Sequence, residues 1–156
     1  MRPNILVQLS KREDVESFRS GLGDTRGVTV LGLDPKTLWR LAGLDALYLS
    51  LPRAEQWGSR LIPPHEAALL RTTAEELQSG MPPYIVTGLI LNEDDPNTAS
   101  FLIPILMDAV LRVVERQNTT HPGAIRSIGF FEYELKLPGI TLDDVGRAFG
   151  QALATR

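Results

Sequence analysis

Residues 125–153 read IRSIGFFEYELKLPGITLDDVGRAFGQAL and decide the predicted fold. The stretch begins with a dense apolar, partly aromatic run over residues 125–131, which is typical of a strand buried within a sheet. It ends with apolar residues at helical spacing from Val145 onward, which predict a helix with one buried face. Thr141 can cap that helix, and Asp144 three residues later completes the pattern of a capping box. The dozen or so residues between strand and helix are predicted to form a loop.

The rest of the chain alternates short apolar runs with helical patterns. Strands separated by helices are typical of an α/β sandwich whose sheet is mostly parallel. We therefore predict a single α/β domain over residues 1–156, with no linker or internal repeat. Four further strands are expected, at residues 4–9, 28–33, 46–51 and 84–91.

Helix signals fall between these runs. Ser10 precedes an acidic turn and is expected to cap the first helix, which Gly23 helps to end. Pro64 fits the first position of a later helix, and Pro104 is expected in the first turn of another. The expected helices after the first cover residues 36–41, 64–79 and 100–117.

Composition limits the classes of function. Hydrophobic residues make up 43% and charged residues 22% of the 156 positions, as in globular proteins. The net charge of −3 argues against a nucleic-acid surface, because phosphate binding needs clustered Lys and Arg. Cysteine is absent, which excludes disulfides and a cysteine nucleophile. No apolar segment reaches membrane-spanning length and none resembles a signal peptide, so we expect a cytoplasmic protein without a membrane partner.

Several segments, in this order, resemble the macrodomain family, whose typical members bind ADP-ribose. Residues 28–38 (VTVLGLDPKTL) resemble the family's opening strand, which ends in Gly-Asp before a short helical turn. Residues 44–51 (LDALYLSL) resemble the next strand, and SIGF at 127–130 resembles the family's Ser-Ile-Ala-Phe. Residues 142–149 (LDDVGRAF) match the helix that follows. The resemblance covers residues 28–153 and implies a macrodomain-like, three-layer α/β/α sandwich with a mixed sheet.

The resemblance also implies where a ligand would lie. Asp34 falls on the family's aspartate that contacts the adenine amino group, although an Asp before Pro is also a common helix-start residue. The family's Asn-Ala-Ala-Asn, which helps to bind the distal ribose, falls on residues 49–52 (LSLP), so that only Ser50 is polar there. The glycine-rich loop that follows is reduced to Gly58. Its neighbour Trp57 can stack on a planar ligand or, as we expect for a large aromatic side chain, fill the pocket.

The family's second loop cradles the diphosphate through backbone N–H groups, and here it reads ELKLPG at residues 134–139. Glu134 brings negative charge toward an anion, and two such charges about 4 Å apart cost on the order of 4 kcal/mol in a partly buried site. Pro138 removes one N–H group, while Lys136 offsets part of the charge and Gly139 keeps a hinge. The resemblance thus implies a binding or interaction module for a nucleotide-derived small molecule, with weak or lost ADP-ribose binding and no cofactor.

Two other functions remain open. Glu132 and Glu134 would share one face of a continuing strand and, with Asp143, could serve a carboxylate-based hydrolase or a metal-dependent phosphoesterase. We favour the simpler explanation of a solvated strand end and favourable charges at a helix start. The two histidines fit no metal or triad pattern, so no metal site is expected. The leucine-rich stretches 47–51 and 101–111 leave a self-associating scaffold, and hence a homo-oligomer, open.

Overall fold

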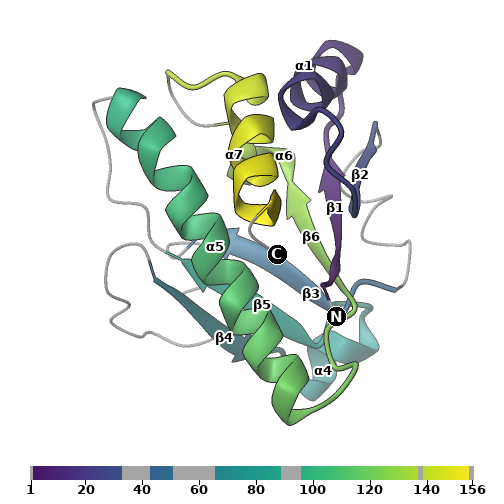
Figure 1. Cartoon of the computed structure of the whole chain (residues 1–156). Helices are drawn as coiled ribbons and strands as arrows, with labels where there is room; N and C mark the ends of the chain where they lie inside the picture. Colours follow the sequence, from purple (N-terminus) through teal and green to yellow (C-terminus); the bar gives the residue numbers. More distant parts are fainter. Residues whose placement is uncertain (1, 33–42, 51–65, 89–95, 137–138, 155–156) are drawn as a thin grey trace.

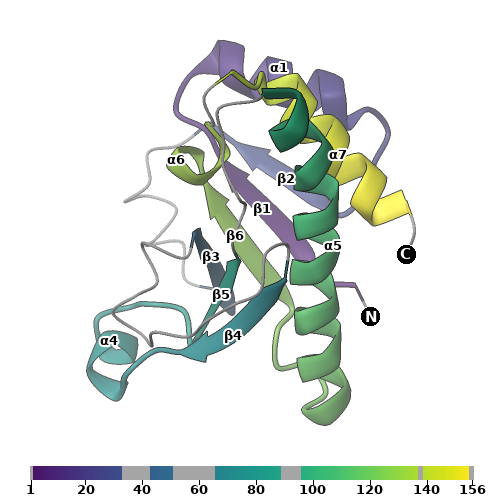
Figure 2. The same cartoon turned by 90° about the vertical axis from the view of Figure 1, so that its left-hand side faces the viewer.

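The computed structural model describes residues 2–32, 43–50, 66–88, 96–136 and 139–154 (Figure 1), with the side chains of residues 96–102 left aside. In these residues six strands form one sheet in the order β2-β1-β6-β3-β5-β4 (Figure 2). All neighbouring strands are parallel except β4 and β5, which pair antiparallel at one edge. The predicted α/β class and the mostly parallel sheet are confirmed. The strands are β1 (Asn4–Gln8), β2 (Val28–Leu31), β3 (Ala46–Ser50), β4 (Ala67–Arg71), β5 (Tyr84–Gly88) and β6 (Ser127–Phe131).

Three of the described helices cover one face of this sheet (Figure 2): α1 (Arg12–Leu22), α5 (Pro96–Thr120) and α7 (Leu142–Ala154). Two shorter helices, α4 (Ala74–Gln78) and α6 (Glu132–Leu135), follow β4 and β6. The described residues contain no helical layer on the opposite face, so the three-layer arrangement stays a prediction. No helix in this part of the chain is both long and apolar enough to cross a membrane.

The main core lies between the sheet and the three large helices, and aromatic side chains connect its parts. Phe130 of β6 stacks on Tyr48 of β3, with 5.2 Å between the ring centroids. Phe130 also packs edge to face against Phe149 of α7, with 5.1 Å between the ring centroids. Phe149 in turn packs edge to face against Phe18 of α1, with a centroid distance of 5.3 Å. Such contacts contribute about 0.5–1.5 kcal/mol each beyond the apolar area that they bury. The predicted buried strand and the apolar face of its helix are thus confirmed.

The opposite face of the sheet carries a smaller apolar cluster. It is formed by alternate residues of the same strands: Leu47, Leu49, Leu70, Ile85 and Phe131. Most described apolar side chains of residues 101–111, the second leucine-rich stretch, are buried in the main core, and Ile105 is the exception at 39% exposure. Both stretches therefore supply core side chains, and self-association stays a prediction.

The helix predicted over residues 64–79 is wrong for residues 67–71, which form the edge strand β4. Alanine and leucine favour a helix locally, but antiparallel pairing with β5 and burial of Leu70 override that preference. Within the described part of that prediction, residues 66–79, only Ala74–Gln78 are helical, and Thr73 and Glu76 form a capping box at their start.

Pro104 lies inside α5 and not in its first turn, because the helix already begins at Pro96. A proline inside a helix removes one backbone hydrogen bond and costs about 3 kcal/mol. Buried side chains on either side of it offset that cost by packing against the sheet. They are Ile103, Leu106, Met107 and Val110.

Candidate functional site

The connections of the sheet diverge at the carboxyl ends of β1, β6 and β3. From β1 the chain passes to β2 on one side, whereas from β3 it goes on to β4 at the opposite edge, and β6 lies between them. In open α/β sheets, ligands bind where connections diverge in this way. The candidate site is therefore this carboxyl edge of the sheet, where β1 ends at Gln8, β3 ends at Ser50 and α6 follows β6. Figure 1 shows α6 at the end of β6.

Glu132 begins α6 and its carboxylate binds Ser10, which follows β1. The Ser10 backbone N–H donates to Glu132 Oε2 at 2.9 Å, and the Ser10 hydroxyl donates to Oε1 at 2.9 Å. Parallel pairing places Gln8 opposite Phe131, and this register brings the two partners together although they lie 122 positions apart. Two strand ends are thereby connected by one carboxylate.

The side chain of Gln8 completes this network. It is fully buried, its Nε2 donates to Ser10 Oγ at 3.1 Å, and its Oε1 accepts the Glu132 backbone N–H at 3.3 Å. These opposite roles of the amide oxygen and nitrogen fix the orientation of the Gln8 side chain. Because Gln8 donates to one lone pair of Ser10 Oγ, the proton of the Ser10 hydroxyl can point toward Glu132.

Glu134 is only 9% exposed and binds on the other side of β6. Its Oε2 accepts the backbone N–H of Ser50, the last residue of β3, at 3.1 Å. The prediction that Glu132 and Glu134 share one face is wrong, as is the prediction of a loop here, because residues 132–135 form a helix. The two carboxylates therefore accept N–H groups from opposite sides of β6.

Tyr48 lies two residues before Ser50 on β3 and is buried. Burial, followed by the negative charge of Glu134, raises the pKa of Tyr48 far above its ordinary value. The phenol therefore stays protonated at neutral pH.

Lys136 follows α6, and its ammonium pairs with the Asp14 carboxylate of α1 at 2.8 Å. That hydrogen bond is the main cause that raises the pKa of Lys136, against a smaller opposing effect of desolvation. Its charge is thus directed toward α1. Gly139 is exposed with φ of 76°, a left-handed conformation that favours glycine, so the turn itself explains this residue.

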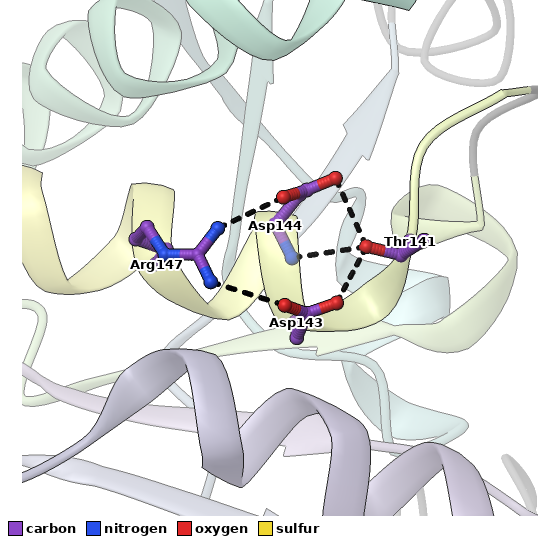
Figure 3. Close-up of polar contacts among 4 residues, drawn as sticks. All are labelled: Thr141, Asp143, Asp144 and Arg147. Carbon is purple, nitrogen blue, oxygen red and sulfur yellow. Dashed lines mark hydrogen bonds and ion pairs between the residues drawn. The ribbon is translucent and has the colours of Figure 1, made fainter.

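A second acidic pair, Asp143 and Asp144, begins α7, and its partners lie within four positions along the chain (Figure 3). The Thr141 hydroxyl lies 2.6 Å from Asp143 Oδ1 and 2.9 Å from Asp144 Oδ2, and its one proton can serve one carboxylate at a time. Arg147 contacts Asp143 at 3.1 Å and Asp144 at 2.9 Å. Hydrogen bonding to Thr141, and then to Arg147, lowers the pKa of Asp143.

The predicted cap is confirmed for Thr141, whose hydroxyl oxygen accepts the Asp144 backbone N–H at 3.4 Å. The return contact of Asp144 goes to the Thr141 hydroxyl. The Asp143 carboxylate binds Thr141 and Arg147 at this cap. Across the described ranges, no three His, Asp or Glu side chains are grouped so as to hold a metal ion. These observations do not favour the phosphoesterase alternative.

A cavity of about 160 Å³ lies at a different place, between α5 and the edge strand β4. Its lining residues are Glu66, Ala67, Ala109, Arg112, Val113 and Arg116. None of these is a predicted site residue, so the cavity and the carboxyl edge are separate features.

Sequence reasoning missed Gln8 and Ser10 as site residues. Ser10 is not the predicted cap: the N-cap of α1 is Lys11, which makes no side-chain capping bond, and Ser10 binds Glu132. The available signal was a polar residue at the last position of an apolar strand, Gln8, and another two positions later, Ser10, because such positions lie at the carboxyl edge of a parallel sheet. Asp34, Trp57 and Gly58 lie outside the described residues, and their roles stay predictions.

Comparisons of this chain with protein-family models, with curated proteins and with solved structures find no match.

Proposed function

We propose that this chain is a divergent macrodomain-like binding or interaction module for a nucleotide-derived small molecule, with weak or lost ADP-ribose binding. The position of the candidate site supports a ligand at the carboxyl edge, where the connections from β1 and β3 diverge. The order of segments that resemble macrodomains, with the three-layer sandwich that it implies, supports a nucleotide-derived ligand. The same resemblance implies that Asp34 would contact the base of that ligand.

One observation carries the proposed loss of ADP-ribose binding. The backbone N–H groups of Ser10 and Ser50 already donate to the carboxylates of Glu132 and Glu134. Anions at such edges depend on backbone N–H groups of this kind. A diphosphate would meet two negative charges instead of open donors, and each repulsion at about 4 Å costs on the order of 4 kcal/mol in a partly buried site.

Calorimetric titration tests the proposal. We expect adenosine to bind the wild-type protein, and Asp34→Ala to abolish the heat because the acceptor for the adenine amino group is gone. Asp34→Asn, which keeps one acceptor oxygen, is the matched control and should retain weaker binding. Micromolar binding of ADP-ribose that Asp34→Ala abolishes would overturn the proposed loss. If adenosine, its phosphates and ADP-ribose all fail to bind, the proposal of a nucleotide-derived ligand is contradicted.

A further inference from the structure

We infer that the Glu132 carboxylate is a built-in anion: it occupies the donors of Ser10 that would otherwise hold an anionic group, and it thereby makes the site select an uncharged nucleoside over a nucleoside phosphate. The choice of a nucleoside rests on the proposed function. The occupation of the donors by Glu132 rests on the geometry alone.

The donors of Ser10 have the arrangement of an anion cradle. A backbone N–H and a hydroxyl of the same residue reach the two oxygens of one carboxylate, each at 2.9 Å. Hydrogen bonds to an ionised acceptor are about twice as strong as those between neutral groups. A phosphate offers the same pair of adjacent oxygens, so it can replace the carboxylate without a change in the donors.

A hydrogen bond from Gln8 fixes the orientation of the Ser10 hydroxyl. Gln8 is fully buried in the sheet and donates to Ser10 Oγ at 3.1 Å, which leaves the hydroxyl proton directed outward at Glu132. Ser10 itself is exposed, so an external anion can reach the donors once the carboxylate is removed.

Glu132 outcompetes a free anion because it is tethered. Its backbone N–H binds Gln8 Oε1 at 3.3 Å, so its side chain starts beside the cradle. A group held at such short range has an effective concentration in the millimolar range or above. Its charge also repels a second anion, whereas an uncharged ligand meets no such penalty.

Glu134 provides a matched comparison. Its Oε2 accepts the backbone N–H of Ser50. Removal of Glu134 frees the Ser50 backbone N–H, whereas removal of Glu132 frees the backbone N–H and the hydroxyl of Ser10 together, and this adjacent pair of donors suits the two oxygens of an anion better.

The test titrates inorganic phosphate into wild type, Glu132→Ala and Glu134→Ala at low ionic strength, after circular dichroism has shown that each is folded. We expect Glu132→Ala to bind phosphate at least about tenfold more tightly than wild type, and Glu134→Ala to remain like wild type. Ser10→Ala added to Glu132→Ala should remove most of the gain. Equal phosphate affinity in wild type and Glu132→Ala would overturn the inference. If Glu132→Ala does not fold, Glu132→Gln is titrated in its place and should show a smaller gain, and no gain overturns the inference equally.

Titration with adenosine and its monophosphate separates the inference from the proposed function. Wild type should prefer adenosine, and Glu132→Ala should lose or reverse that preference. If Glu132→Ala gains phosphate binding but neither adenosine nor its monophosphate binds, the inference about Glu132 is supported and the proposed nucleoside ligand is contradicted. If wild type binds adenosine but Glu132→Ala binds phosphate no more tightly than wild type, the proposed function is supported and the inference about Glu132 is contradicted.

Discussion

The two acidic pairs of the C-terminal third carry the same charges but have different partners. Glu132 and Glu134 accept hydrogen bonds from residues 122 and 84 positions away and connect three strand ends. Asp143 and Asp144 bind Thr141 and Arg147 and serve the start of a single helix. Both pairs begin a helix, but α6 follows β6 directly whereas α7 follows a turn. The difference teaches that an acidic pair at a helix start can be a tertiary connection when the helix continues directly from a central strand, and a local one otherwise.

The largest expected effect tests whether packing, and not its acidic pair, fixes α7. A Cβ on Gly146 would lie 2.2 Å from the backbone oxygen of Phe18 in α1. Gly146→Ala should therefore force the two helices apart and lower the free energy of unfolding by about 3 kcal/mol. In the control, Gly150→Ala, the new Cβ would lie 3.0 Å from Thr25 Oγ1, a side-chain atom that can shift, and 3.6 Å from the Leu22 backbone oxygen, which is ordinary contact. Urea denaturation that shows equal stability for both variants would contradict this account.

The next effect tests the tertiary role of Glu134. Glu134→Ala leaves the Ser50 N–H without its acceptor in a mostly buried place, and should cost about 1–3 kcal/mol of unfolding free energy. Glu134→Gln keeps an acceptor oxygen and should cost less. Chemical denaturation gives both values. If Glu134→Ala were as stable as wild type, the two acidic pairs would not differ in the way described.

A smaller effect appears at alkaline pH through Tyr48. Because its pKa is raised in the folded state, its contribution to stability is complete below the unfolded pKa of about 10 and is lost as pH rises toward the folded pKa. Tyr48→Phe should flatten the fall in unfolding free energy above about pH 10. Glu134→Gln should flatten it in part, since Glu134 is the second cause of the shift. Urea unfolding across that range checks the slope, and an unchanged slope in Tyr48→Phe would exclude the assignment.

The smallest effect concerns the local pair. Arg147 is exposed, so Arg147→Ala should change the unfolding free energy by no more than about 0.5 kcal/mol. The lowered pKa of Asp143 contributes stability above the unfolded pKa of about 3.9, and this is lost as pH falls through the folded value. By NMR titration, Thr141→Ala should raise the pKa of Asp143 more than Arg147→Ala does. The reverse order would show that the ion pair dominates.

The parts of the fold that sequence predicts well are those with a long local pattern. The buried run of β6 and the helical spacing of α7 extend over enough residues to be recognised, and both are confirmed. The strand β4 could not be recognised, because its AALLR segment favours a helix until β5 pairs with it. The four residues of α6 are too few to show a helical period.

The contacts of the candidate site depend on the pairing of strands that are distant in the chain. Ser10 meets Glu132 only because β6 lies beside β1 in a parallel register with Gln8 opposite Phe131. No spacing within the sequence specifies that neighbour. The glutamates could thus be selected as candidate residues, whereas their partners could not.

The place of β6 in the sheet has a consequence for how the chain folds. It comes after the other five strands in the chain, yet it lies between β1 and β3. Until it is synthesised, β1–β2 and β3–β5–β4 are two separate pieces, each with an open hydrogen-bonding edge where β6 belongs. A nascent or truncated chain that stops before β6 therefore cannot close its sheet, and its two unfilled edges invite pairing with other chains. The six-stranded sheet is therefore complete only once the C-terminal third has been added.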